Sequence, residues 1–152
     1  MQRPKVRFCL VFERELLSVP VMRQVLGDTL RGIGVNEDSV SDILLAATEA
    51  CTNVVQHAGH STPAYTVAAT VDGRACRVEV TDAGQGCPRR KGGRARRGGG
   101  ARRGGELAES GRGFEIMHAC MDAVTLRSTP GEGTRVVLDK RIHWAEPLAR
   151  TA

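Results

Sequence analysis

Three short groups of residues have types and spacings that could carry chemistry, and the first contains Glu49 and Asn53. These two residues are four positions apart, so on a helix both side chains lie on one face. The amide oxygen of Asn53 is a neutral, hard ligand that suits Mg²⁺. Glu49, one turn earlier, could orient a water or take a proton from a hydroxyl group. The plain alternative is that both are polar residues on a solvated helix face.

The second group is Asp82-x-Gly84-x-Gly86, which follows an apolar, strand-like run. A carboxylate fixed at a strand end can accept a hydrogen bond from an exocyclic amine such as that of adenine. Glycines just after it let the backbone approach a flat base, because no Cβ is in the way. Asp and Gly are also common in tight turns, so a simple turn is the alternative.

The third group is Gly111-Arg112-Gly113, which opens a helical pattern. Backbone N–H groups at a helix N-terminus favour anions, and missing side chains admit phosphate oxygens. Taken alone, a G-x-G sequence says very little. The order and structural context of the three groups carry more weight than any one of them.

The elements that must position these groups can be read from hydrophobic periodicity. A long helix is predicted from Asn36 or Ser39 to about Ala58, because apolar residues recur there at three- and four-residue intervals. Residues 64–71 and 75–81 are predicted to be strands of a hairpin, since Asp72-Gly73 is a turn dipeptide. The second of these strands leads directly into Asp82.

Three further segments complete the predicted order of elements. A first strand includes Val6 to Phe12, and a helix begins at Ser18 and Pro20 by capping chemistry and ends near Gly32. After Gly113 the pattern predicts a helix and then a last hairpin, with Val124 and Leu126 facing Val136 and Leu138. This order predicts an α+β fold, a two-layer sandwich with helices on one face of a mixed, mostly antiparallel sheet. One domain, residues 1–152, is expected.

Charge is concentrated in one segment. Residues 89–105 contain eight basic side chains, seven glycines and no acid, so the rest of the chain carries −3 of the total +5. No core could absorb this segment. It contains no aromatic residue on which bases could stack, so nucleic-acid binding is not favoured.

The remaining composition excludes several classes of protein. No apolar run approaches the roughly 20 residues needed to cross a bilayer, and the basic N-terminus does not lead into a signal peptide. The five cysteines show no C-x-x-C spacing, so neither a disulfide framework nor a zinc site is predicted. We therefore expect a cytoplasmic protein with no membrane association.

Taken together, the motifs resemble those of the GHKL (Bergerat-fold) ATP-binding superfamily, and within it the bacterial anti-sigma-factor serine/threonine kinases. The resemblance covers residues 15–142 and rests on E-A-x-T-N-x-x-x-H at 49–57, D-x-G-x-G at 82–86, G-R-G-F at 111–114 and Gly133-Thr134. It implies ATP and Mg²⁺ as ligands. It also implies that the Arg/Gly-rich segment, at about 88–108, is the ATP lid.

The resemblance also implies a role for individual residues. Glu49 matches the catalytic glutamate and Asn53 the Mg²⁺ ligand. Asp82 matches the residue that reads the adenine amino group, and Thr134 one that holds the adenine end through water. The matching glycine and phosphate-side positions are Gly84, Gly86, Gly111, Arg112 and Gly113.

The function implied is an anti-sigma factor that sequesters a sigma factor and phosphorylates a serine on an anti-anti-sigma antagonist. A homodimer is also implied. The alternative is a non-catalytic ATP-binding regulatory protein, in which nucleotide sets the shape of a binding surface. A sensor histidine kinase is not favoured, since 152 residues leave no room for a phosphoacceptor domain.

Overall fold

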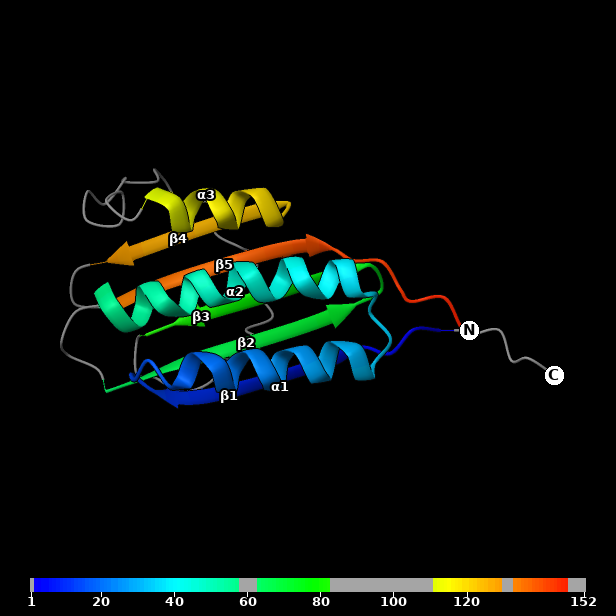
Figure 1. Ribbon diagram of the computed structural model, residues 1–152, viewed down its shortest axis with the longest axis horizontal. Coiled ribbons are helices and arrows are strands. Elements are labelled where there is room, and N and C mark those ends of the chain that lie inside the picture. Colours follow the sequence, from blue (N-terminus) through cyan, green and yellow to red (C-terminus); the bar gives the residue numbers. More distant parts are fainter. Residues whose placement is uncertain (1, 58–62, 83–110, 130–132, 148–152) are drawn as a thin grey trace.

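A computed structural model describes residues 2–57, 63–82, 111–129 and 133–147. The predicted ATP lid at about 88–108, together with Gly84 and Gly86, lies outside the described residues. The helices and strands of the described part follow the predicted order (Figure 1). Along the chain they are β1 (Val6–Glu13), α1 (Ser18–Gly32), α2 (Glu37–His57), β2 (Ala64–Asp72), β3 (Ala75–Thr81), α3 (Gly111–Cys120), β4 (Ala123–Thr129) and β5 (Gly133–Arg141).

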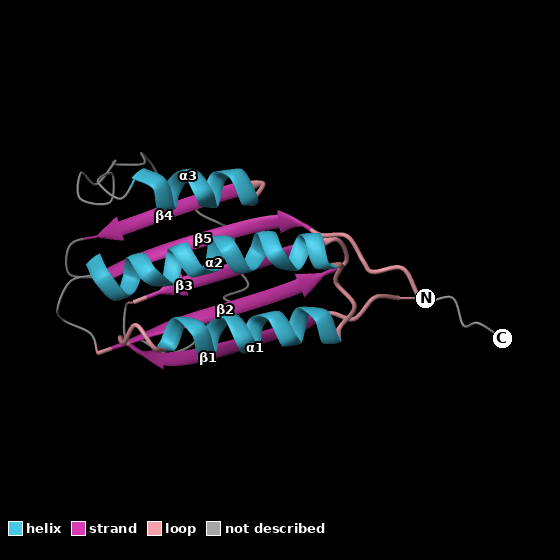
Figure 2. Cartoon of the chain, in the orientation of Figure 1, coloured by secondary structure: helices cyan, strands magenta, loops and turns pink. Residues whose placement is uncertain are grey.

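The five described strands form one sheet in the order β1-β2-β3-β5-β4. All four pairings are antiparallel. Both hairpins have the expected partners, with Val124 opposite Leu138 and Leu126 opposite Val136. The helices lie together on one face of the sheet (Figure 2). The predicted two-layer α+β architecture is therefore confirmed.

The core lies between the sheet and the helices, where strand alternation and helical periodicity meet. On β2, Tyr65, Val67, Ala69 and Val71 are fully buried and point to the helices, because side chains of a strand alternate between faces. Helices α1 and α2 supply the opposite wall with Met22, Leu26, Leu30, Val40, Ile43, Ala47, Ala50 and Cys51. Aliphatic and small residues build most of this core, in agreement with an aromatic content of 3%.

Helix α1 starts without the side-chain capping bond that the sequence predicts. The helix begins at Ser18 as expected, but its N-cap is Leu17, which makes no side-chain capping bond. The Ser18 hydroxyl instead bonds the backbone oxygen of Glu15 and the hydroxyl of Tyr65, each at 2.6 Å. A buried tyrosine needs a hydrogen-bond partner, and this need, rather than helix capping, determines how Ser18 is used.

The cysteines differ partly from expectation. Cys51, Cys76 and Cys120 are free and buried. Cys9 in β1 is disulfide-bonded, so the prediction of no disulfide framework is wrong at that residue. Burial raises the pKa of Cys51 and of Cys76 to about 12, so neither is a reactive thiolate near neutral pH.

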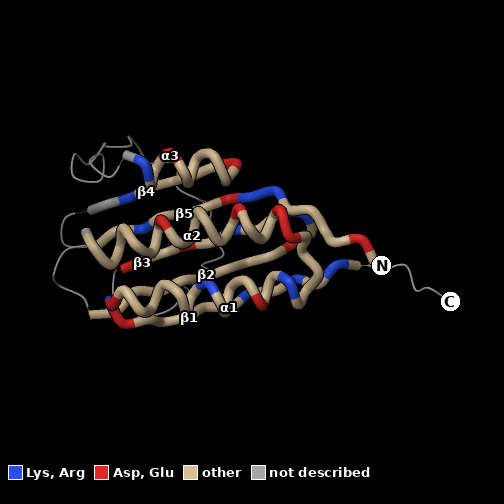
Figure 3. Tube along the Cα trace, in the orientation of Figure 1, with Lys and Arg blue, Asp and Glu red and all other residues tan. Residues whose placement is uncertain are grey.

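Charged residues are distributed over several elements of the described chain. Basic positions occur at the start of β1 and at the end of β5, which lie at the same end of the sheet (Figure 3). In the described part of the chain, none of the helices combines the length and the apolar character that crossing a bilayer requires.

Candidate functional site

The C-terminal half of α2 presents Glu49 and Asn53 toward α3. The neighbouring Ala50 and Cys51 are fully buried in the core, which fixes the rotation of the helix about its axis. Asn53 is 7% exposed, whereas Glu49 is half-buried. An amide buried to this degree at the margin of the core indicates a built site rather than a solvated helix face.

Gly113 in the first turn of α3 packs directly onto these two side chains. A Cβ added at Gly113 would lie 3.0 Å from Oε2 of Glu49, and 3.7 and 3.8 Å from the amide nitrogen and oxygen of Asn53. The glycine therefore allows a close approach that a Cβ would disturb by pushing on Glu49, and no unusual backbone conformation is involved. The contact brings the N-terminal turn of α3, with its outward-pointing N–H groups, beside Glu49 and Asn53.

Asp82 follows β3 and faces the start of β5. Its backbone N–H donates to the oxygen of Thr134 at 3.1 Å, and the N–H of Thr134 donates to Oδ1 of Asp82. The Asp82 residue is only 2% exposed. This reciprocal pair holds a buried carboxylate at the strand end in a fixed orientation, as a group that reads a ligand by hydrogen bonding must be held.

These parts lie at one end of the molecule. Figure 1 shows the end of α2, the start of α3, the end of β3 and the start of β5 at the same side. The structure thus places Glu49, Asn53, Gly113, Asp82 and Thr134, from four elements or strand ends, at the same end of the molecule. Gly111 is the first residue of α3, and Arg112 is exposed beside it.

The donor set fits a nucleotide with a lightly ligated divalent cation. Mg²⁺ usually keeps several waters and takes few protein ligands, which agrees with a single amide oxygen from Asn53. Among the described residues, no group of three or more His, Cys, Asp or Glu side chains could hold a metal by itself. The close approach at Gly113 leaves backbone N–H groups and not a side chain beside the two polar residues, which suits phosphate oxygens.

Sequence reasoning missed Lys140, which stabilises the position of α3. Its ammonium group lies 2.9 Å from Oδ2 of Asp42 in α2 and 2.6 Å from the backbone oxygen of Cys120, the last residue of α3. The lysine side chain is 16% exposed. The available signal was its place in β5: Val136, Leu138 and Lys140 alternate on the helix-facing side, where a lysine is unusual.

Comparison with known proteins decides the family. Residues 12–140 match the family described as the histidine kinase-like ATPase domain. The chain belongs to this family. The matched region includes Glu49, Asn53, Asp82, Gly113 and Thr134. The resemblance inferred from the motifs is therefore confirmed.

Curated relatives of this ATPase-domain protein share about a third of the residues in the region that they match. An anti-sigma F factor of Pasteuria penetrans is 33% identical over 115 residues, which is 74% of this chain and 75% of the relative. Anti-sigma F factors of Thermoanaerobacter sp. (32% over 106 residues, 69% and 72%) and Clostridium acetobutylicum (29% over 110 residues, 72% and 75%) are similar.

A solved structure shares the fold. The crystal structure of the RsbU and RsbW domains of Rv1364c from Mycobacterium tuberculosis matches with a TM-score of 0.68 at 20% identity. The match covers 96% of this chain but only 35% of that longer one. At this identity the likeness bears on the fold alone.

Proposed function

We propose that this protein is an ATP-binding anti-sigma factor with serine kinase activity. The observation that carries the proposal is the contact of Gly113 with Glu49 and Asn53, at the same end of the molecule as the Asp82–Thr134 pair, in a member of the histidine kinase-like ATPase family. The names of the relatives, all anti-sigma F factors, supply the class of partner.

Each residue has a part that its surroundings support. The buried Asp82 carboxylate, oriented by the N–H of Thr134, accepts a hydrogen bond from the adenine amino group. Asn53 would hold Mg²⁺, and the amides of the first turn of α3 would bind phosphate oxygens. ATP, when bound, supplies the phosphoryl group.

Glu49 is the proposed general base. Its Oε2 lies against the first turn of α3, and a serine hydroxyl of the antagonist would give its proton to that carboxylate. Cys51, two residues before Asn53, is excluded from this role because burial raises its pKa to about 12. The Arg/Gly-rich segment at about 88–108 would be the ATP lid, and the chain 1–152 a single ATPase domain in the cytoplasm.

The test uses purified protein, a sigma factor and an antagonist from the same organism. We expect the sigma factor to be retained with ATP, and the antagonist to release it and to acquire phosphoserine. Glu49→Gln should keep ATP binding and sigma retention but lose phosphoserine formation. Retention of no sigma factor, with or without ATP, would refute the anti-sigma proposal.

The alternative is a regulatory protein whose nucleotide state alone sets partner binding. It predicts that Glu49→Gln leaves antagonist-driven release of the sigma factor unchanged over many cycles, and that wild type makes no phosphoserine. The half-buried position of Glu49 against Gly113 favours the kinase, because a carboxylate held at a packed helix contact is placed for a specific task.

We further propose that the protein forms a homodimer through β1, which is an edge strand of the described sheet. A second copy paired antiparallel about Leu10 would place Arg7 opposite Glu13 and Phe8 opposite Phe12. Opposite charges across an antiparallel pair are favourable. In such a twofold interface each contact occurs twice, once on each side of the axis. An exposed edge strand also needs a cover.

Exposed aliphatic side chains near the same strand support this interface. They are Val11 (60% exposed), Leu16 (62%), Leu17 (78%) and Val21 (52%). Arg7→Glu should convert the dimer to monomer in light-scattering measurements, because two glutamate pairs would face each other. The double variant Arg7→Glu/Glu13→Arg should restore the dimer, and failure of this rescue would argue against the β1 interface.

A further inference from the structure

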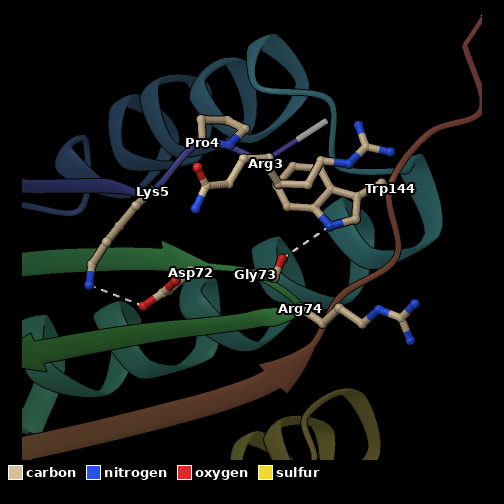
Figure 4. Close-up of a pocket in the computed structure, with 8 residues that line it drawn as sticks. Arg3, Pro4, Lys5, Asp72, Gly73, Arg74 and Trp144 are labelled. Carbon is tan, nitrogen blue, oxygen red and sulfur yellow. Dashed lines mark hydrogen bonds and ion pairs between the residues drawn. The ribbon is translucent and has the colours of Figure 1, made fainter.

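A cavity of about 850 Å³ lies at the end of the sheet opposite Asp82. Three segments line it: residues 2–5 before β1, the tip of the β2–β3 hairpin at 72–74, and Trp144 after β5 (Figure 4). Strand β3 separates this cavity from Asp82, since Ala75 begins the strand and Asp82 follows its end. Seven strand residues span roughly 20 Å, so the cavity is distinct from the candidate nucleotide site.

Hydrogen bonds fix the walls of this cleft. The indole N–H of Trp144 donates to the backbone oxygen of Gly73 at 3.0 Å, and Trp144 forms a β-bridge with Val35. The backbone N–H of Ile142 donates to the oxygen of Arg74 at 2.8 Å. The hairpin tip and the segment after β5 therefore hold each other in place, and the cleft is formed before any ligand arrives.

The cleft has an excess of positive charge. Arg3, Lys5 and Arg74 line it together with a single acid, Asp72. Lys5 already forms an ion pair with Asp72 at 3.1 Å. No ion pair within the described part of the chain involves Arg3 or Arg74. Two exposed guanidinium groups thus border one cavity, and none of the described carboxylates forms an ion pair with either of them.

The cleft is also lined by Trp144, an unusual residue in this chain. Trp144 is the single tryptophan, in a protein with few aromatic residues, and it is only half-buried. The guanidinium carbon of Arg3 lies 4.9 Å from its ring centroid, a cation–π distance that orients the arginine at the cleft. Tryptophan and arginine are among the residues most enriched at the energetic centres of protein interfaces.

We propose that this cleft is a second binding site, which takes an acidic peptide segment of a protein partner. Carboxylates of the segment pair with Arg3 and Arg74, whose planar groups suit bidentate contacts, and an apolar side chain packs on Trp144. A peptide fits better than nucleic acid, because successive bases stack on several aromatic side chains, whereas the lining of this cleft offers one indole that Arg3 partly covers.

The single tryptophan makes the test direct, because its emission reports on the cleft itself. The full-length protein is titrated with the hexapeptide Asp-Glu-Leu-Asp-Glu-Leu, and its neutral analogue Asn-Gln-Leu-Asn-Gln-Leu serves as the ligand control. We expect a saturable emission change with the acidic peptide only, which weakens as salt is raised. Saturating ATP should leave the peptide affinity unchanged within twofold, because the two sites are far apart.

Matched variants locate the binding. Arg3→Gln and Arg74→Gln should each weaken peptide binding roughly three- to tenfold, and the double variant should lose it, while both residues are exposed enough for the fold to persist. Arg135→Gln removes the same charge at the other end of the sheet, where Arg135 pairs with Glu79, and should change the affinity less than twofold.

Three results would overturn the inference. The first is an acidic peptide that leaves the emission unchanged. The second is equal affinity of wild type and the Arg3→Gln/Arg74→Gln variant for that peptide. The third is an emission change with a short thymidine oligonucleotide but not with the peptide, which would make the cleft a nucleic-acid site. None of these results depends on ATP binding or phosphoryl transfer, so they leave the proposed function untouched.

Discussion

Substituting Gly113 with alanine separates site geometry from fold stability. The new Cβ would lie 3.0 Å from Oε2 of Glu49, whereas ordinary van der Waals contacts of a Cβ begin near 3.4 Å. Glu49 must therefore shift by a few tenths of an ångström. The carboxylate is the far end of a flexible, half-buried side chain, so it can move without disturbing the core.

The expected consequence is slower phosphoryl transfer in a protein that is at least as stable. A 1 Å misplacement of a catalytic group costs about a hundredfold in rate, so a shift of about half that size should cost roughly tenfold. Replacing a helical glycine with alanine meanwhile stabilises a helix by about 0.5–1 kcal/mol. Single-turnover phosphoserine formation measures the first effect, and thermal unfolding the second.

A matched control lies in α1. Gly32 is the last residue of that helix, and a Cβ added there would meet nothing within 4 Å. Gly32→Ala should keep the wild-type rate of phosphoryl transfer, because it is the same substitution made far from the site. If Gly113→Ala transferred phosphate as fast as wild type, the position of Glu49 against α3 would not matter for the reaction and our reasoning would be wrong.

Three further predictions concern Asp82, Lys140 and the buried Tyr65–Cys51 pair. Asp82→Asn should lower ATP affinity by roughly 1.5–3 kcal/mol, about ten- to a hundredfold, with little change for GTP; calorimetry that finds equal ATP affinity in the folded variant would remove Asp82 from the adenine site. Lys140→Met should lose about 1–2 kcal/mol of stability, because a largely buried ammonium group no longer joins Asp42 and Cys120. The midpoint of thermal unfolding should fall by about 2–8 °C, whereas Lys5→Met, at an exposed ion pair, should barely move it. Burial raises the pKa of Cys51 from 9.0 and of Tyr65 from 10.0 to about 12 each. These groups ionise first in the unfolded chain, so their stabilising effect is complete below pH 9 and is lost as the pH rises toward 12. Denaturant titrations at pH 8–11 should show this loss, and Cys51→Ala should reduce its slope by about one proton; a slope equal to that of wild type would contradict the assignment.

Local patterns predicted most of the elements because short-range physics determines them. Helix α2 has the predicted position, since its apolar residues follow the 3.6-residue period over five turns. The hairpin β2–β3 follows from the turn at Asp72-Gly73, where Gly73 adopts a positive φ of 59°. Both features depend on residues that are neighbours in the sequence.

Contacts between distant segments could not be read in the same way. The sequence indicates that Gly113 opens a helix, but not that this glycine lies against Glu49, which is far away along the chain. Ser18 has the chemistry of a helix cap, and only the burial of Tyr65 redirects its hydroxyl. The sequence does not distinguish Lys140 from a surface lysine, because its partners lie in α2 and α3, which only the fold brings to it. In each case the partner is chosen by packing.

The pairing of β3 with β5 has a consequence for how the chain can vary. Asp82 and Thr134, which hold each other across this pair, are 52 residues apart in the sequence. Loop-closure entropy grows only with the logarithm of loop length, so doubling the connection costs about 0.6 kcal/mol. Residues added between Asp82 and Gly111 would thus hardly weaken the strand pairing, and proteins of this fold can differ in length there. The same separation means that the Asp82–Thr134 contact forms after the β2–β3 hairpin, whose ends are close in sequence.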